Sequence, residues 1–361
     1  MSMRPCKKEL ENFLENRKPK ECRVVVMPDF FLDRFISLPW GTAEFTTLIN
    51  QVVKRKGGSI DGISQVDMQG GNSINVASAI ANLGAKVIPI ICTSEYGSQQ
   101  IKHHLKTAQV DTSHIKIFDK ASVTTALEFQ TQDMKTNVML RDVGSLADFG
   151  PANLDHDDYK LIEEADYVCL FNWAGTLKFG TALAQAVFGR VKQRGRGKTY
   201  YATADPTPNA DGISGLMENV LKTDIVDILS VNENEAVTYA ALLDEGLNEK
   251  KRHVGFAELA LEAARVLAKR LSARIDLHTT AFSATLHGEK EAVVPTFKVE
   301  PLRATGAGDA WDAGNITGDW NALSDECRLM LANAVSACYL LDSEGKHPNK
   351  NKLLSFLRST A

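Results

Sequence analysis

Short apolar runs alternate with longer stretches of helical spacing along most of the chain. Five runs rich in β-branched or aromatic residues predict buried strands: "CRVVVM", "KVIPIIC", "DYVCLF", "TYYATAD" and "DIVDILSV". Helical spacing covers residues 72–85, 97–108, 177–194, 212–222 and 254–272. This alternation predicts an α/β fold in which helices cover both faces of a mostly parallel sheet.

Two segments break the alternation. Residues 41–68 hold a polar insertion, and residues 115–142 contain three stretches typical of successive strands, "IKIF", "VTTALEFQTQ" and "TNVMLRD". We expect both segments to form a small β lid, because ligands of open α/β sheets bind beyond the carboxyl ends of the strands. A solvated edge is the alternative. Unpaired lid strands also favour a homodimer through the lid.

Composition narrows the class of protein. With 361 residues, 44% hydrophobic and 24% charged, the chain can bury a full core. We expect a charged helical extension at residues 1–21 and a single domain at residues 22–361. The net charge of −4 gives no basic surface for nucleic acid, and no apolar run is long enough to span a membrane. Six scattered cysteines and a charged N-terminus favour a cytoplasmic location.

One motif points to phosphate chemistry. In "RATGAGDAWDAG", residues 303–314, the residues Gly306, Ala307 and Gly308 leave a helix start nearly bare of side chains. Backbone N–H groups at a helix start lack partners in the helix and lie at its positive end, so they can hold a phosphate as an anion hole. Asp309 stands where phosphoryl transfer needs a base for the attacking hydroxyl. A tight turn capped by Asp309 is the alternative.

Two further helix starts carry polar residues. "GGNSIN" occupies residues 70–75, and "VNENEA" occupies residues 231–236 after a strand. The side-chain oxygens of Asn232 and Glu235 suit Mg²⁺, which often keeps its waters. Together, "GGNSINVASAIANLGA", "VNENEA" and "TGAGDAWDAG" resemble the motifs of the ribokinase family of carbohydrate and nucleoside kinases, the phosphofructokinase-B-like group.

The resemblance implies a fold and an activity. The fold is a ribokinase-like three-layer αβα sandwich with a mostly parallel central sheet and a small β lid. The activity is that of a carbohydrate kinase, which transfers a phosphoryl group from ATP, with Mg²⁺, to a hydroxyl of a sugar or related polyol. A nucleoside or a phosphosugar is the alternative acceptor, and Arg141 and Arg55 are available to bind a phosphosugar. A non-catalytic ligand sensor on the same fold is a further alternative.

The resemblance also implies roles for single residues. Asp309 matches the catalytic base, and the anion hole matches Gly306, Ala307 and Gly308. The substrate-binding residues that it implies are Asp33, Gly71, Asn72, Asn75 and Asn172. The nucleotide-binding residues are Asn232, Glu235, His278 and Asn333, and the first two of these would organise Mg²⁺ through water. Each also has a structural interpretation as a helix cap, a loop residue or a packed side chain.

Two departures from the family pattern surround the nucleotide. Arg303 and Ala304 replace an Asp-Thr pair, and His278 and Ala281 replace two glycines of the nucleotide loop. In many relatives the aspartate helps to bind a potassium ion that orders the loop, whereas a guanidinium repels a cation. We therefore predict that activity does not require potassium.

Overall fold

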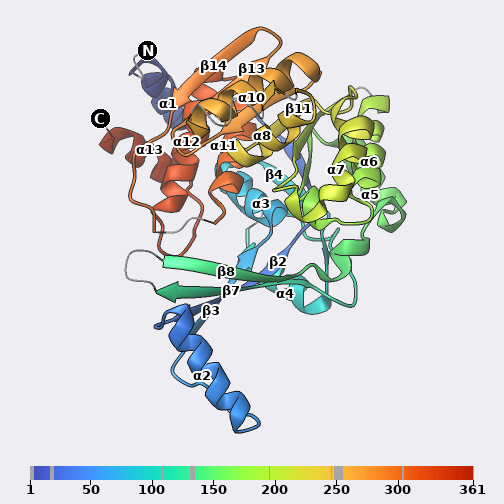
Figure 1. Cartoon of the computed structure of the whole chain (residues 1–361). Coiled ribbons are helices and arrows are strands. Elements are labelled where there is room, and N and C mark those ends of the chain that lie inside the picture. Colours follow the sequence, from blue (N-terminus) through green and yellow to red (C-terminus); the bar gives the residue numbers. More distant parts are fainter. Residues whose placement is uncertain are drawn as a thin grey trace.

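A central sheet of eight strands has the order β14-β13-β12-β11-β10-β9-β1-β4 (Figure 1). The computed structural model describes residues 4–16, 20–107, 109–130, 135–194, 196–244, 246–247, 255–302 and 305–360. The strands from β12 to β4 are parallel, and β13 and β14 are antiparallel. Their bounds are β1 (Arg23–Met27), β4 (Lys86–Pro89), β9 (Tyr167–Phe171), β10 (Lys198–Ala202), β11 (Ile228–Val231), β12 (Arg274–His278), β13 (Phe282–His287) and β14 (Lys290–Pro295).

Helices cover both faces of this sheet. Val25 and Met27 of β1 belong to one core, and Val24 and Val26 belong to another, because successive strand side chains point to opposite faces. The helices over the first face are α5 (His156–Glu164), α6 (Gly180–Arg194), α7 (Ile213–Leu216), α8 (Glu233–Ala241) and α10 (Phe256–Arg270). Those over the second face are α3 (Asn72–Leu83), α4 (Glu95–His104), α11 (Ala307–Trp320) and α12 (Asp325–Leu340). The predicted α/β sandwich is confirmed.

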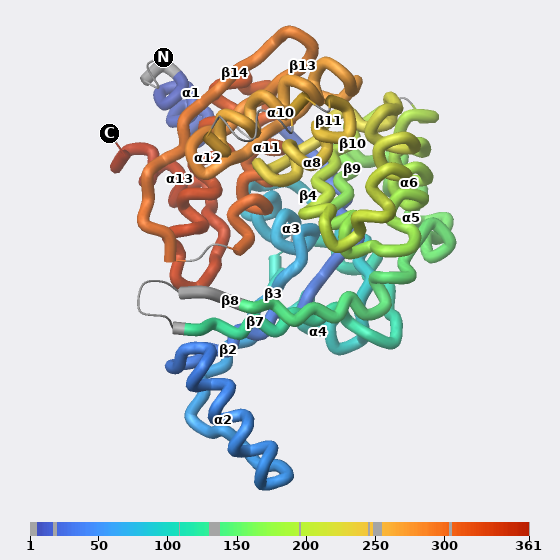
Figure 2. Tube along the Cα trace, in the orientation of Figure 1, coloured from blue at the N-terminus to red at the C-terminus, as the bar shows by residue number. Residues whose placement is uncertain are grey.

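The two ends of the chain meet on α12. Helix α1 (Arg4–Asn16) lies beside α13 (Lys350–Ser359), and both pack against α12 (Figure 2). Leu10 and Phe13 of α1 are buried in the same core as Leu353 of α13. Among the described helices, none is long and apolar enough to cross a membrane.

A second sheet of four strands corresponds to the predicted lid and is called the lid sheet below. Its order is β3-β2-β7-β8, with β2 (Phe31–Leu38), β3 (Ser64–Gly70), β7 (Ser122–Gln130) and β8 (Lys135–Asp142). Strand β2 follows β1 after three residues, so the chain passes directly from the central sheet into the lid. The lid strands therefore start beside the carboxyl ends of the parallel strands, where ligands of such sheets bind.

The expectation of β structure throughout the two lid segments is wrong in two places. Much of the 41–68 insertion is a helix, α2 (Thr42–Lys54), which projects away from the rest of the molecule and buries no residue (Figure 1). Lys116–Ile117, within "IKIF", forms β6, which pairs with β5 (Cys92–Thr93) outside the lid sheet. The inner strands of the lid sheet are β2 and β7, and the sequence pattern did not single out β2 because its burial alternates only weakly.

Candidate active site

Polar side chains gather at the carboxyl edge of the parallel sheet. Asp29 follows β1, Asn172 follows β9 and Asn232 follows β11, while His278 ends β12. The N-terminal ends of α3 and α11 approach the same edge, because side chains of Asn72 and Asn75 on α3 reach Asp309 on α11.

The carboxylate of Asp309 is held by two amides. Nδ2 of Asn72 donates to Oδ1 of Asp309 at 2.7 Å, and Nδ2 of Asn75 donates to Oδ2 at 2.8 Å. Only 6% of Asp309 is exposed, and burial raises the pKa of its carboxyl to about 7. A carboxyl group with this pKa is partly ionised at neutral pH and can accept a proton there.

The turn before Asp309 requires glycine. Gly306 precedes α11 with φ +83°, and a Cβ atom on it would lie 2.6 Å from the hydroxyl oxygen of Tyr339. A Cβ atom on Gly308 would lie 3.1 Å from Cε1 of His278. No side chain of a described residue caps the start of α11, so the N–H groups of this helix start can receive an anion.

Asp29 organises this part of the site, and the sequence analysis missed it. Its Oδ1 accepts from the backbone N–H and the hydroxyl of Ser73, and its Oδ2 accepts from the backbone N–H of Asn72. Asn172 donates to the same Oδ2 from Nδ2 at 3.0 Å, while its own Oδ1 accepts from the N–H of Gly175. The side chain of Asn172 is thus engaged by the protein itself. An acidic residue two positions after the first strand was the available signal.

Asp33 lies on β2, a strand of the lid sheet. Its Oδ1 is buried without a hydrogen-bond partner among the described residues, while Thr124 bonds the carboxyl group. Burial raises the pKa of Asp33 to about 6. Gly70 leaves room for it, because a Cβ atom there would lie 2.0 Å from Oδ2 of Asp33. Gly71 has φ +93° and approaches the backbone of Phe30 to 2.8 Å at its Cβ position, so no larger residue fits.

Two residues predicted near Mg²⁺ bond each other. Asn232 caps α8 by accepting from the N–H of Glu235 at 3.0 Å. Glu235 in turn accepts from the N–H of Asn232 at 3.1 Å and from its Nδ2 at 2.8 Å. Glu235 is buried, and burial raises its pKa to about 7. In the described part of the chain, no three His, Cys, Asp or Glu residues are placed to hold a metal ion directly.

A cavity of about 340 Å³ lies on the other side of the anion hole. His278, Ala307, Gly308, Trp311 and Asn333 are among the residues that line it. The imidazole of His278 packs on the indole of Trp311 with ring centres 5.1 Å apart, and burial lowers the pKa of His278 to about 4. His278 is therefore neutral at physiological pH.

Asn333 fixes the wall of this cavity. Its Oδ1 accepts from Nε1 of Trp311 at 2.9 Å and from the hydroxyl of Ser283, and its Nδ2 donates to the carbonyl of Pro295 at 3.1 Å. These bonds hold the indole of Trp311 in place. Asn333 thus lines the predicted nucleotide side, with both ends of its amide already bonded to the protein.

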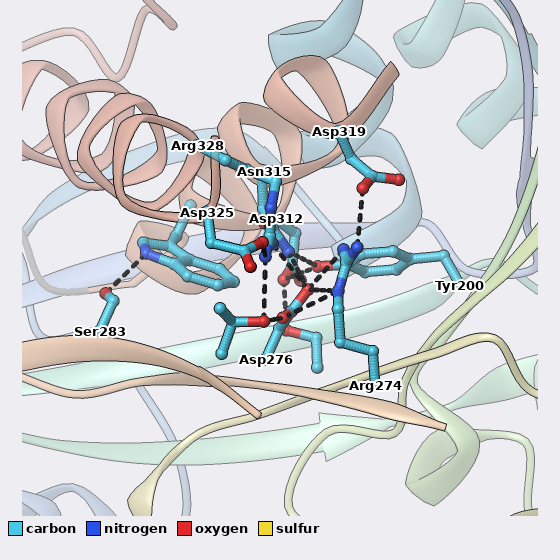
Figure 3. A network of polar contacts seen from close by, with 12 residues as sticks. Tyr200, Arg274, Asp276, Ser283, Asp312, Asn315, Asp319, Asp325 and Arg328 are labelled. Atoms are coloured by element: carbon cyan, nitrogen blue, oxygen red, sulfur yellow. Dashed lines mark hydrogen bonds and ion pairs between the residues drawn. The ribbon is translucent and has the colours of Figure 1, made fainter. Parts of the chain in front are cut away.

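A buried polar network anchors α11 to the central sheet (Figure 3). Asp312 of α11 accepts from the hydroxyl of Tyr200 on β10 at 2.7 Å and from that of Ser230 on β11 at 2.6 Å. Asp276 on β12 accepts from Asn315 of α11 and from Arg328 of α12, a residue that is only 1% exposed. The network was not predicted, because its members are far apart in sequence and only the fold brings them together.

One arginine residue of the sequence analysis, Arg141, lies near Asp33, and its charge opposes the rise in the pKa of that carboxyl. Arg141 on β8 is exposed, with its guanidinium carbon 5.0 Å from the ring centre of Phe31. Arg55 donates to the carbonyl of Ser59 near the end of α2. Arg303 and Ala304 lie outside the described residues.

The chain matches a known protein family along most of its length. The family model described as "pfkB family carbohydrate kinase" matches residues 41–352, a range that begins after Asp33 and contains Asp309. A search among curated proteins gives no significant match.

Solved structures share the fold at low sequence identity. The ribokinase of Arabidopsis thaliana in complex with ribose and ATP has a TM-score of 0.69 and 17% identity, covering 94% of this chain and 100% of that chain. The adenosine kinase of Sinorhizobium meliloti has a TM-score of 0.69 and 16% identity, covering 95% of this chain and 100% of that chain. A Cryptococcus neoformans ribokinase in complex with ADP has a TM-score of 0.69 and 16% identity, covering 94% and 99%. The chain has a ribokinase-like fold and belongs to the pfkB family of carbohydrate kinases.

Proposed function

We propose that the protein is a small-molecule kinase that transfers a phosphoryl group from Mg²⁺-bound ATP to a hydroxyl of a sugar or related polyol. One observation carries the proposal. The buried carboxyl group of Asp309, with a pKa of about 7, directly follows a helix start that no described side chain caps. Ala307 and Gly308 of this helix start also line a cavity. A base and an anion hole thus adjoin a space for a donor nucleotide, as phosphoryl transfer requires.

The mechanism assigns each group a part. Asp309 accepts the proton of the acceptor hydroxyl while that oxygen attacks the terminal phosphorus of ATP, and the bond from that phosphorus to the bridging oxygen breaks to release ADP. Backbone N–H groups at Gly306, Ala307 and Gly308 stabilise the negative charge of the moving phosphoryl group. Mg²⁺ bound with the nucleotide supplies charge neutralisation at the phosphate oxygens. Asn232 and Glu235 fit its water ligands, because their oxygens lie at one helix start and face the same acidic region as Asp309.

The acceptor is proposed to bind under the lid. Asp33 offers a buried carboxylate oxygen without a partner among the described residues, which suits a hydroxyl donor. Gly71 lets the start of α3 pack against the backbone of Phe30, and Asn75 offers an amide. The structural neighbours include a ribokinase bound to ribose and an adenosine kinase, so sugars and nucleosides are the acceptors to test first. A phosphosugar is favoured only if Arg141 contributes to binding.

The donor is proposed to occupy the cavity beside His278 and Trp311. ATP is the proposed nucleotide, because neighbours of this fold are seen with ATP and with ADP. Potassium is expected to be unnecessary, so turnover in potassium, in sodium and in a bulky ammonium buffer should agree within a few-fold. A tenfold response to potassium, about 1.4 kcal/mol in barrier terms, would contradict this expectation.

The lid is proposed to close over the acceptor and to mediate a homodimer in the cytoplasm. Val138 and Leu140 on the edge strand β8 are 46% and 56% exposed, which suits a contact with a second copy. Light scattering after size-exclusion chromatography should give the mass of a dimer, and Leu140→Lys should give that of a monomer. A monomeric wild type would contradict the dimer.

The experiment that tests the function is an acceptor screen. Sugars, nucleosides and sugar phosphates are incubated with radiolabelled ATP and Mg²⁺, and labelled product is counted. At least one neutral polyol should be phosphorylated with ATP consumed in equal amount. Calorimetry with polyol and with nucleotide tests the alternative of a non-catalytic ligand sensor. Such a sensor would bind a polyol and show neither nucleotide binding nor turnover.

A further inference from the structure

The side chain of Asn72 contacts the proposed base. Resting on the proposed function of Asp309, we propose that Asn72 is a positioning residue, which orients the carboxylate of Asp309 and stabilises its ionised form. Its role would then differ from the reading of acceptor hydroxyls that the sequence implies. The contact that carries this is the hydrogen bond from Nδ2 of Asn72 to Oδ1 of Asp309, at 2.7 Å.

The backbone of Asn72 is fixed before its side chain reaches Asp309. Its N–H donates to Oδ2 of Asp29 at 2.9 Å, and Asp29 is fully buried. The next residue, Ser73, binds the other oxygen of Asp29 with both its N–H and its hydroxyl. Gly71, with φ +93°, sets the entry into α3. The amide of Asn72 therefore extends from a rigid start toward the base, which is the geometry of a group that orients another.

Asn75, one turn later on α3, is placed differently. Its Nδ2 donates to Oδ2 of Asp309 at 2.8 Å, and its side chain also lines a cavity of about 630 Å³ between α3, β3 and residues 343–347. Its backbone N–H is used inside the helix, bonded to the carbonyl of Gly71. Asn75 can thus turn toward an acceptor that enters from this cavity while Asn72 stays on the base. Each carboxylate oxygen has two lone pairs, so Asp309 can accept an incoming hydroxyl as well.

Acidic groups surround Asp309 and disfavour its ionised form. The amide of Asn72 opposes this effect. Asp29 after β1 and Asp33 on β2 raise the pKa of Asp309 by repulsion. Glu235 on α8 and Asp312 on α11 face the same region, and Arg141 on β8 is a cation near Asp33. The two asparagine amides lower the pKa of Asp309 against this repulsion. Loss of the Asn72 donor should therefore leave less of the ionised base at neutral pH.

The test is the pH dependence of kcat/KM in the full-length protein, since its acidic limb reports the base in the free enzyme. Asn72→Ala should move that limb to higher pH by about half to one unit. It should also lower kcat about tenfold, from lost orientation, and leave the KM of the acceptor within about twofold. Asn72→Asp puts a second carboxylate against the base, so it should move the limb further in the same direction.

Three further variants make the outcome decisive. Asn82→Ala, an exposed asparagine on the same helix, should leave the limb in place. Asn75→Ala should raise the KM of the acceptor more than Asn72→Ala does. Asp309→Asn should lower turnover by about 10² to 10⁴-fold.

Two results separate the proposals. If Asn72→Ala raises the acceptor KM and leaves the limb unmoved, Asn72 is a substrate reader and the inference is wrong, while the function stands. If Asp309→Asn turns over within about threefold of the wild-type rate, the proposed function itself fails. Nucleotide binding by calorimetry shows that each variant is folded, so a low rate in a folded variant still counts.

Discussion

Three buried carboxyl groups, those of Asp309, Asp312 and Glu235, lie at or near the first turns of α8 and α11. Burial raises their pKa values to about 7, 8 and 7, respectively. Ionised carboxylates are costly inside a protein, so each needs a reason to be there. In the proposed chemistry, Asp309 is the base and Glu235 organises Mg²⁺ through water. Asp312 instead bonds Tyr200 and Ser230, and its function is to hold α11 on the sheet.

Asp312 should make stability depend on pH. Its pKa in the folded chain is about 8, above the ordinary value of 3.8, so its contribution to stability is fully present below about pH 4 and is lost as the pH rises through 8. Asp312→Asn keeps an oxygen for both hydroxyls and cannot ionise. The stability of the variant relative to wild type should therefore rise by about 4 kcal/mol between pH 5 and pH 9, measured by urea unfolding. An unchanged difference between the two pH values would show that Asp312 is ionised in the folded protein.

At the scale of elements, the helix starts were predictable and their mutual contacts were not. The Gly-rich sequence before Asp309 and the polar start of α3 are local patterns, and α11 and α3 begin where those patterns place them. The bonds between Asn72, Asn75 and Asp309 join residues more than 230 positions apart, which no local pattern encodes. The same holds for Asp29, whose partners come from α3 and from the end of β9. Local sequence patterns could identify the polar residues of the site. Only the fold determines which of these residues form hydrogen bonds with each other.

The anion hole should be sensitive to a single methyl group. Gly306→Ala would force an alanine into φ +83° and bring its Cβ atom to 2.6 Å from the hydroxyl of Tyr339. We expect a loss of about 2 kcal/mol in stability and weaker nucleotide binding by calorimetry. Gly189→Ala is the matched control, because it lies within α6 with nothing near its Cβ position and should be neutral or stabilising. Equal effects of the two substitutions would mean that the turn has no special role.

At the scale of the whole molecule, the lid sheet is a separate layer that starts directly from β1. The alternation of apolar runs predicted the central sheet, because buried parallel strands carry a strong local signal. The lid was predicted only in part. Strand β2 has few buried positions and α2 has none, so neither shows the burial pattern on which such predictions depend.

Lid closure should be visible by hydrogen exchange. Acceptor and nucleotide together should slow exchange in β2, β3, β7 and β8, because closure removes water from their inner face. Helix α2 serves as an internal control, since it buries no residue and projects away from the body. Protection that is the same in the lid strands with and without ligands would argue against closure.

The central claim is that Asp309 takes the proton of the acceptor hydroxyl, and one measurement tests it most directly. An acceptor found in the screen is mixed with labelled ATP and an excess of enzyme, and single-turnover rates are compared for wild type and Asp309→Asn. The substituted amide has nearly the same shape but cannot accept the proton, so binding of both ligands should persist while the rate falls by about 10² to 10⁴-fold. A rate within about threefold of wild type, with both ligands bound, would contradict the assignment of Asp309 as the base.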